Sequence, residues 1–316
     1  MGRYIARRLG QGGFVLWAAF TISFFLLYVL PSDAASIKAA GADGDLSDPE
    51  LVARLRAEQG LDRPVLVQYA HGLWGALHLD FGRSFSSGAP ATKLLAEALP
   101  PTLQLTALAL GLALVGGAAL ALASTFPRAR WLRHALASLP ALGISLPTFW
   151  VGLLLLQWFS FELRLFPAMG NEGFESLVLP AFTLAIPASA AFAQVLSRSL
   201  RQTLAEPYVE TARAKGAGRV RVHFGHALRN ASIPALTVLG VTVGGLLAGA
   251  VVTETVFSRA GIGRLTVTAV NQQDVPVVQA IVVFSAVVFV VVTLLVDLLY
   301  PVLDPRITTR QPSAAA

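Results

Sequence analysis

The stretch from Val277 to Leu299 reads VVQAIVVFSAVVFVVVTLLVDLL, and Asp297 is the charged residue within it. A helix needs about 20 mostly apolar residues to cross the roughly 30 Å hydrocarbon core of a bilayer, so this stretch is long enough to span. Lipid offers the backbone no hydrogen-bond partners, so a spanning segment in a chain of this kind has to be helical. The stretch therefore predicts an α-helical integral membrane protein.

Further apolar stretches of similar length precede it. They cover Gly13 to Leu30, Thr102 to Ala123, His134 to Phe159, Leu177 to Leu200, and Ile233 to Thr255. The composition agrees, because 55% of the 316 residues are hydrophobic, 13% are charged and the mean hydropathy is +0.65. That leaves too little polar surface to cover a soluble globule. Prolines fall inside or at the start of these spans at Pro140, Pro147, Pro180 and Pro187. We expect six kinked, mutually packed spanning helices.

The first span follows the basic residues Arg3, Arg7 and Arg8. The apolar core of a cleaved signal peptide also follows basic residues, so the two alternatives must be compared. Ala34-Ala35-Ser36 is an acceptable cleavage site for such a peptide. The apolar run from Gly13 to Leu30 is nevertheless longer than the roughly 7 to 15 residues of a signal core. We therefore favour a retained first helix.

Most of the 24 Lys and Arg residues lie on one predicted side of the membrane. They are Arg3, Arg7, Arg8, Arg128, Arg130, Arg133, Arg198, Arg201, Arg213, Lys215, Arg219, Arg221, Arg229, Arg306 and Arg310. The positive-inside rule makes that side, with both termini, cytoplasmic. These residues sit in short loops between apolar spans, so the net charge of +6 does not indicate nucleic-acid binding.

This topology divides the chain into four parts. Residues 1–30 are the cytoplasmic N-terminus and first helix, 31–98 an extracytoplasmic segment, 99–302 a five-helix core with a cytoplasmic loop at 201–231, and 303–316 a cytoplasmic tail. The outer segment should contain one helix between Asp48 and Gly60 and a second from Val65 to Leu77.

Residues that would carry catalysis or bind a metal do not form a recognisable motif. The sequence contains no G-x-x-x-x-G-K-[ST], H-E-x-x-H or G-x-S-x-G pattern and no cysteine. His223 and His226 are spaced to share a helix face, but no carboxylate accompanies them, so packing is favoured over metal ligation. We predict no catalytic residue, no metal site and no enzymatic activity for this chain.

The loop between the fourth and fifth spans contains Ala205-Glu-Pro-Tyr-Val-Glu-Thr-Ala-Arg-Ala-Lys-Gly216. Glu206 and Pro207 form a good helix start, and Gly216 can adopt the left-handed conformation that ends a helix. A short helix with a defined end is therefore predicted. Tyr208, Thr211, Ala212 and Lys215 fall on one face of it. Spacing alone does not distinguish a helix that rests on lipid headgroups from one that docks on a partner.

Glu210-Thr-Ala with Gly216 and Ile233-Pro234 resembles the EAA signature of the membrane subunits of binding-protein-dependent ABC importers. The run from Tyr208 to Gly216, followed by His226-Ala-Leu-Arg-Asn230, is similar to the peptide, dipeptide and nickel branch. The similarity extends over nearly the whole chain. It includes Phe81–Ser84, Pro100–Leu103, Phe166–Gly170, Leu179–Ala181, Glu254–Phe257, Gly261–Leu265 and the segment from Leu298 to Arg306.

The resemblance implies the fold of a six-helix type I ABC importer transmembrane subunit with a small extracytoplasmic segment, in a prokaryotic inner membrane. It implies a second, related membrane subunit, two ATP-binding subunits and an extracytoplasmic substrate-binding protein as partners. ATP and Mg would belong to the ATPase subunits, so this chain would hold no cofactor. The coupling helix of that family docks on the ATPase subunit, which assigns this role to Tyr208, Glu210, Thr211, Ala212, Arg213, Ala214, Lys215 and Gly216.

By this resemblance the chain forms half of a translocation pathway for di- or oligopeptides or related small solutes. The alternative is a secondary transporter or channel that works without ATPase partners. A secondary transporter would be expected to show an inverted repeat and a pair of buried carboxylates for ion coupling, and the sequence shows neither.

Polar residues within spans are energetically costly and are therefore candidates for the pathway. Gln194 lies in the fourth span and Glu254 near the end of the fifth. Glu254 could act in the pathway or gate, or could extend to the outer interface by snorkelling. Gly244 and Gly245 belong to a small-residue pattern with Gly240 and Gly249, which suits either close helix packing or a narrow pathway.

The predicted topology can be tested with cysteines placed at Ser47 or Ser87, because the chain has no native cysteine. Each should react with a membrane-impermeant thiol reagent in intact cells, since residues 31–98 are predicted to face outward. Labelling that occurs only after lysis would reverse the assigned orientation.

Overall fold

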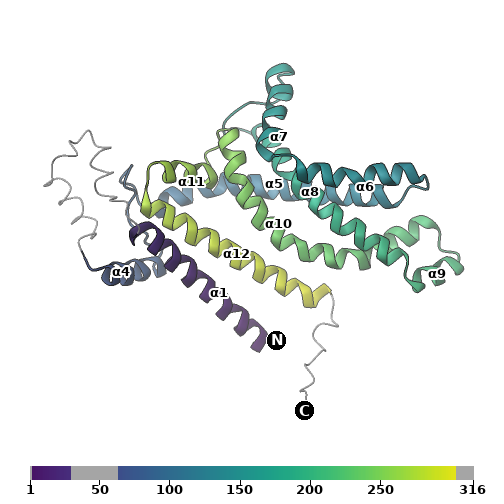
Figure 1. The fold of residues 1–316 in the computed structure, drawn as a ribbon, viewed down its shortest axis with the longest axis horizontal. Coiled ribbons are helices and arrows are strands. Elements are labelled where there is room, and N and C mark those ends of the chain that lie inside the picture. Colours follow the sequence, from purple (N-terminus) through teal and green to yellow (C-terminus); the bar gives the residue numbers. More distant parts are fainter. Residues whose placement is uncertain (1, 30–62, 304–316) are drawn as a thin grey trace, which may run out of the picture. The chain divides into compact units, whose positions relative to one another are not determined.

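The computed structural model describes residues 2–29 and 63–303, and these form helices joined by short loops (Figure 1). The β contact found within these two ranges is an isolated bridge between Arg83 and Pro90. The prediction of an all-α protein is therefore confirmed. The helix predicted between Asp48 and Gly60, and the tail at 304–316, lie outside the described residues.

Four helical segments are long and apolar enough to cross a membrane on their own. They are α1 (Gly2–Phe24) with its π-helical continuation η1 (Phe25–Val29), α5 (Ala91–Thr125), α8 (Glu175–Leu204) and α12 (Val275–Leu303). Two bent helix pairs raise the number to six if each pair counts as one span. The first pair is α6 (Arg130–Ser145) with α7 (Thr148–Leu155) and η2 (Leu156–Glu162). The second consists of η3 (Arg221–Ala227) and α10 (Leu228–Val256), which bend by 58° within α10, between the arms Arg221–Ala235 and Gly240–Val256. The six predicted apolar stretches fall on these six segments.

Three shorter helices lie between the spans. α4 (Val65–Leu77) has the predicted bounds, and α9 (Pro207–Ala214) lies in the loop that was predicted to hold a short helix. α11 (Ile262–Asn271) was not predicted. It is too short to span, and it follows Gly261, whose extended backbone precedes the first turn.

The predicted third span is not one continuous helix, because α6 and the α7–η2 segment meet at an angle of 99°. Leu146 and Pro147 are both extended, with ψ angles of 129° and 127°. A residue that precedes proline is driven away from the helical region by the proline ring, and proline itself suits the start of the next helix. Pro147 therefore breaks the span, whereas Pro140, Pro180 and Pro187 remain inside helices.

The chain packs as two compact units. One comprises residues 1–101 with 260–291, and the other residues 102–259 with 292–316. These two units are defined by packing. The predicted boundaries at residues 30, 98 and 302 concern instead the side of the membrane on which each part lies, and they remain predictions. In the first unit, residues of α5, α11 and α12 form one apolar cluster that includes Ala98, Ile262 and Val277.

A buried carboxylate connects two loops of the first unit. Asp274, which is 2% exposed, accepts hydrogen bonds from the Ser84 hydroxyl, the Phe85 amide (3.0 Å) and the Ser86 hydroxyl (2.9 Å). Several donors on one carboxylate offset the cost of its burial. The turn before α12 is thereby tied to the loop after α4.

In the second unit α8 is the central helix, and a larger part of it is buried than of α1, α5 or α12. It packs against α6, α7 and α10 (Figure 1). Two apolar clusters lie along it. One joins Leu105 and Ala109 of α5 to Leu184 and Leu246, and the other joins Ala121 to Leu196, Leu200 and Ala231.

The contact between α5 and α8 requires a glycine at residue 117. A Cβ atom there would lie 2.7 Å from the Ser189 carbonyl oxygen and 2.9 Å from the Phe192 ring, whereas one at Gly111 would meet nothing within 4 Å. Gly117→Ala should therefore destabilise the chain by about 1–3 kcal/mol, because the backbone oxygen cannot move aside cheaply. Gly111→Ala is the matched control and should be neutral or stabilising, since alanine is the better helix former.

The unfolding temperatures of both purified variants in detergent should be compared, with size-exclusion chromatography used to monitor the folded fraction. Equal unfolding temperatures for the two variants would contradict this packing of α5 on α8.

Candidate functional site

The loop helix α9 has a defined start. It contains eight residues and follows Glu206, whose backbone is extended with φ −72° and ψ 143°. Pro207 occupies the first position, where the missing N–H group costs nothing because the helix has no acceptor for it. The predicted start is confirmed.

The end of α9 is also closed by hydrogen bonds. Gly216 has a φ of +84°, the Gly216 amide donates to the Arg213 carbonyl (2.9 Å), and the Ala217 amide donates to the Ala212 carbonyl (3.0 Å). This pair of bonds is the Schellman motif, which satisfies the last helical carbonyls and needs a residue with positive φ. The prediction that Gly216 ends the helix in a left-handed conformation is confirmed.

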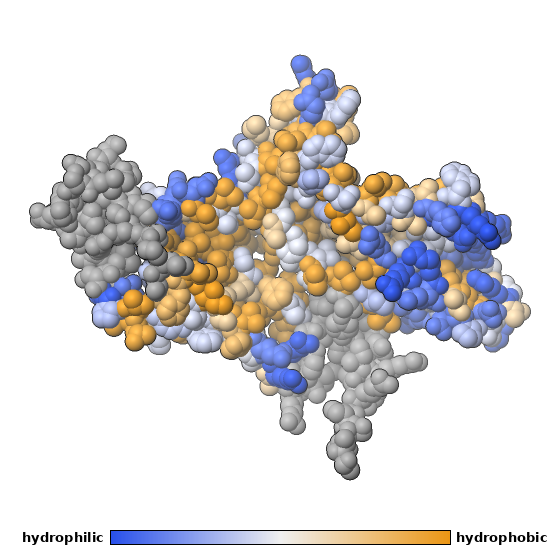
Figure 2. All heavy atoms as spheres, viewed as in Figure 1, coloured by the Kyte–Doolittle hydropathy of each residue, from blue (hydrophilic) through white to orange (hydrophobic). Residues whose placement is uncertain are grey.

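The predicted coupling residues form an accessible surface on α9. Ala212 is half-buried, and the other residues of the set, namely Tyr208, Glu210, Thr211, Arg213, Ala214, Lys215 and Gly216, are exposed. Val209 is fully buried and attaches the opposite side of the helix to the rest of the unit. Hydrophilic side chains gather around α9 in Figure 2. The helix therefore presents one side to a partner, a lipid surface or solvent.

Tyr208 has a second role that the sequence pattern did not reveal. It is 39% exposed, and its hydroxyl accepts a hydrogen bond from Asn230 Nδ2 (2.9 Å) and donates one to the His226 carbonyl (3.4 Å). These contacts tie the start of α9 to η3 and the first turn of α10. The signal in the sequence was the motif His226-Ala-Leu-Arg-Asn230, which carried the family resemblance but no assigned contact.

Glu254 lies near the end of α10 and is fully buried, with 0% exposure. Thr102 donates a hydrogen bond from its hydroxyl to Glu254 Oε1 (2.6 Å), which links α10 to α5. Snorkelling would require the carboxylate to reach the surface, so that alternative is wrong for this structure. A role of Glu254 in the pathway or gate remains a prediction.

Arg259 is the buried cation of the same region and was missed by the sequence analysis. It is 1% exposed, and its Nη1 donates to the carbonyls of Gly170 and Ser176, both at 3.0 Å. Its Nε and Nη2 have no hydrogen-bond partner among the described residues. Burial lowers the pKa of the Arg259 guanidinium, and the nearby negative charge of Glu254 raises it. Arg259 thereby fastens the loop before α8 to the end of α10.

The other predicted pathway residues differ from Glu254 in burial. Gln194 is exposed on α8, and Gly245 is exposed on α10, where an added Cβ would meet nothing within 4 Å. Gly244 is half-buried. Gly249 packs closely, because a Cβ there would lie 2.7 Å from a Leu184 methyl group. The assignment of Gln194, Gly244 and Gly245 to a pathway stays a prediction.

The histidines are not gathered with other metal-binding side chains. Within residues 2–29 and 63–303, no cluster of three or more His, Cys, Asp or Glu could hold a metal ion. His223 is buried and packs edge-on against Phe126, with ring centroids 5.3 Å apart. Its surroundings are those of a packed side chain.

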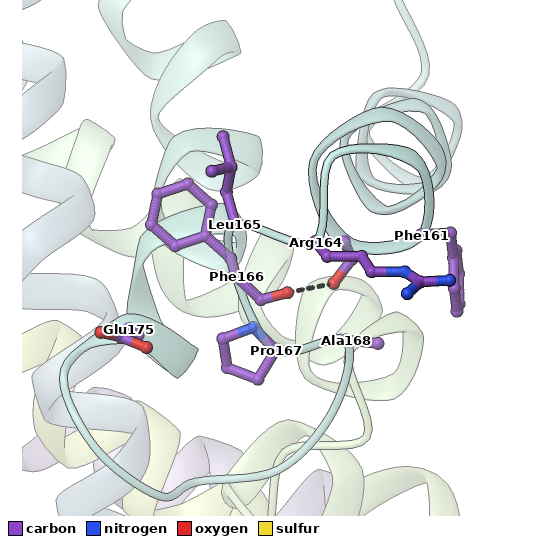
Figure 3. A pocket seen from close by; sticks show the side chains of 8 residues that line it. Phe161, Arg164, Leu165, Phe166, Pro167, Ala168 and Glu175 are labelled. Atoms are coloured by element: carbon purple, nitrogen blue, oxygen red, sulfur yellow. Dashed lines mark hydrogen bonds between the residues drawn. The ribbon is translucent and has the colours of Figure 1, made fainter.

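An open cavity of about 400 Å³ lies where η2 ends and the next loop begins. Its lining includes Phe161, Arg164, Phe166 and Glu175 (Figure 3). The Ser160 hydroxyl donates to the Phe166 carbonyl (2.6 Å), which closes one wall. In Figure 3 the side chains of Arg164 and Glu175 lie on opposite sides of the loop and point away from each other, so they do not converge on a common ligand position.

The fold and the loop helix define a helical, multi-pass membrane protein. Residues 1–106 match the model of the N-terminal part of binding-protein-dependent transport system membrane components, and residues 113–309 match the model of the binding-protein-dependent transport system inner membrane component. The chain belongs to this family of inner membrane transport components. The family membership supports the importer interpretation over a secondary transporter or channel.

Individual proteins agree with this assignment. A probable peptide ABC transporter permease of Sinorhizobium fredii is 37% identical over 315 residues, which are 97% of this chain and 99% of that protein. A glutathione transport system permease of Salmonella choleraesuis is 36% identical over 307 residues, again 97% of this chain and 99% of that protein. A solved inward-facing methionine ABC transporter is 16% identical, covers 66% of this chain and 96% of its own, and has a TM-score of 0.54, which supports the fold.

The buried cluster around Glu254 yields two variants with different expected effects. Thr102→Val keeps the charge of Glu254 but removes a hydrogen bond to it, so the free energy of unfolding should fall by about 1.5–3 kcal/mol. Glu254→Gln keeps the shape but removes the negative charge beside Arg259, so transport and binding-protein-stimulated ATP hydrolysis should both fall. Unfolding temperature, uptake and hydrolysis should be measured on both variants. If Glu254→Gln leaves uptake and hydrolysis unchanged, the pathway role is withdrawn.

Proposed function

We propose that this chain is the subunit that forms half of the translocation pathway of an ATP-driven importer and that α9 couples it to the ATPase subunits. The observation that carries the proposal is the build of α9. A force-transmitting helix has to be short, stiff and fixed at both ends, because slack would let the ATPases close without moving the spans. α9 has eight residues, a proline start and a Schellman end, and it is anchored through Tyr208 and Val209.

The proposed assembly contains a second, related membrane subunit, two ATP-binding subunits and an extracytoplasmic binding protein. ATP and Mg are held by the ATPase subunits, which perform the hydrolysis, and this chain binds no cofactor. Both termini and α9 lie on the cytoplasmic side, in agreement with the concentration of Lys and Arg in the same loops. ATP-driven closure then moves α9 as a rigid body and changes the access state of the pathway.

The proposed substrates are di- or oligopeptides or related small solutes. The support is the identity of 36–37% to permeases whose names state peptide or glutathione transport. Growth of a strain that lacks this gene on single dipeptides, tripeptides or glutathione as the sole nitrogen source would test this class, with the unmodified strain as reference. Unchanged growth on every one of them would contradict it.

Three α9 variants test the coupling role. Gly216→Val places a β-branched residue at a φ of +84°, where the left-handed backbone costs an L-residue roughly 1–2 kcal/mol, so the helix end should loosen. Tyr208→Ala removes the aromatic contact and the link to Asn230, and Glu210→Arg reverses an exposed charge. In each variant the spans should still insert, while uptake falls and the ATPase subunits co-purify less or hydrolyse ATP without transport.

Gly218→Val is the matched control for Gly216→Val. Gly218 is exposed, an added Cβ would meet nothing within 4 Å, and its φ is not positive. The control should retain uptake. Wild-type uptake in all three α9 variants at equal membrane abundance would count against a coupling helix and favour a helix that rests on lipid.

A further inference from the structure

The end of α5 is capped by a residue of the α9 loop. Phe126 follows the last residue of α5, and its amide donates to the Leu122 carbonyl (2.9 Å), so it continues the last turn. Its own carbonyl is one of those that a helix leaves without a partner. Arg219 donates to this carbonyl from Nη2, and its guanidinium carbon lies 4.9 Å from the centroid of the Phe126 ring. The same side chain therefore holds both the backbone and the ring of Phe126.

The Phe126 ring is also enclosed by the π-helical segment η3. His223 meets it edge-on with an interplanar angle of 85°, and the Phe224 ring lies 6.3 Å away. His223 is 4% exposed, so this contact is inside the unit. The apolar cluster of Ala121, Leu196, Leu200, Ala227 and Ala231 adjoins this region and is built from α5, α8, η3 and α10. The ends of these helices therefore form one packed group.

Arg219 is placed so that it can pass movement of α9 to this group. It lies three residues after Gly216, which ends α9, while Tyr208 anchors the start of α9 to Asn230. We infer that the Arg219–Phe126 contact is a second mechanical link of the coupling loop, one that makes the end of α5 move together with α9. The inference rests on the proposed function and names two positioning residues within it, Arg219 and Phe126.

The competing interpretation is an ordinary helix cap that adds stability and nothing else. A cap of that kind predicts that Arg219→Ala lowers the unfolding temperature but leaves the movements of the folded transporter unchanged. A mechanical link predicts that, once Arg219→Ala has removed the contact, the end of α5 separates from the loop when the ATPases close. The two interpretations differ in a distance within the folded protein, which does not depend on the identity of the substrate.

The experiment places spin labels on cysteines at Arg128 and Val220, which are exposed and flank the contact. This chain has no native cysteine, so within it the labels are unique to these positions, and the partner subunits are used in cysteine-free form. The full transporter with its ATPase subunits is reconstituted in nanodiscs, and the distance between the labels is measured with ADP and with ATP plus vanadate. Without further substitution the distance should be the same in both states. In Arg219→Ala it should lengthen or broaden with ATP plus vanadate.

Two further variants and one control sharpen the result. Arg219→Lys keeps the charge, one donor and the cation over the ring, so it should restore a narrow distance distribution in part. Phe126→Leu keeps the backbone carbonyl but removes the ring, so it should broaden the distribution. Arg221→Ala removes an exposed arginine of the same loop and should behave as the unsubstituted protein. A changed distance in the otherwise unsubstituted protein, or an unchanged one in Arg219→Ala, would overturn the inference.

A double-mutant cycle gives the functional readout. The ratio of binding-protein-stimulated to basal ATP hydrolysis should fall about fivefold or more in Arg219→Ala and in Phe126→Leu, within the usual range of coupling between sites. The double variant should lose no more than the worse single variant, because both substitutions break one contact. Losses that multiply would contradict a shared contact.

Failure of this inference can be distinguished from failure of the proposed function. If Tyr208→Ala and Glu210→Arg leave the association of the ATPase subunits unchanged, the docking role of α9 is wrong. If those two variants lose association while Arg219→Ala keeps both the distance and the hydrolysis ratio of the unsubstituted protein, the docking role stands and the link through Phe126 is wrong.

Discussion

The hydrocarbon core of a bilayer offers no hydrogen bonds, so every backbone group that leaves a helix there must find a partner inside the protein. The breaks between helices show how this chain meets that requirement. At the start of α8 the carbonyls of Gly170 and Ser176 accept from Arg259. After η2 the Phe166 carbonyl accepts from Ser160. Polar side chains are therefore concentrated where helices end, and the candidate sites lie in the same places.

The buried charges connect segments that are far apart in the sequence. Glu254 receives a bond from Thr102, and Asp274 receives several from Ser84 and its neighbours. A hydrogen bond to a charged group contributes about 1.5–3 kcal/mol, but a buried carboxylate that lost its donors would cost more than it contributed. Few substitutions of the carboxylate or of its hydrogen-bond donors would preserve such a contact. They hold the end of α10 on α5, and the turn before α12 on the loop after α4, in one arrangement.

Hydropathy predicted the spans because the bilayer imposes a length and an apolarity that can be counted along the chain. Turn chemistry predicted both ends of α9, because proline starts and glycine ends depend on adjacent residues. The 99° break at Pro147 was not predicted, since a proline in a span can kink a helix or end it, depending on what packs beside it. The burial of Glu254, the partner of Tyr208 and the whole role of Arg259 were missed for a related reason. Each depends on residues 18 to 152 positions away in the sequence, and the spacing of neighbouring residues does not predict such contacts.

The size of the contacts around α9 bears on how such a loop could work. Coupling between distant sites typically amounts to about 1–3 kcal/mol, which is the scale of one or two good polar contacts. A mechanical link therefore does not need to be strong. It needs to deform by less than the distance that the coupling loop moves. In this chain the two bonds of Tyr208 and the contact of Arg219 with Phe126 lie at opposite ends of the α9 loop, and the irregular backbone between α9 and η3 is short. The rings of His223 and Phe224 also pack on Phe126, so loss of the Arg219 contact alone should leave the end of α5 folded and should reduce coupling more than it reduces folding stability.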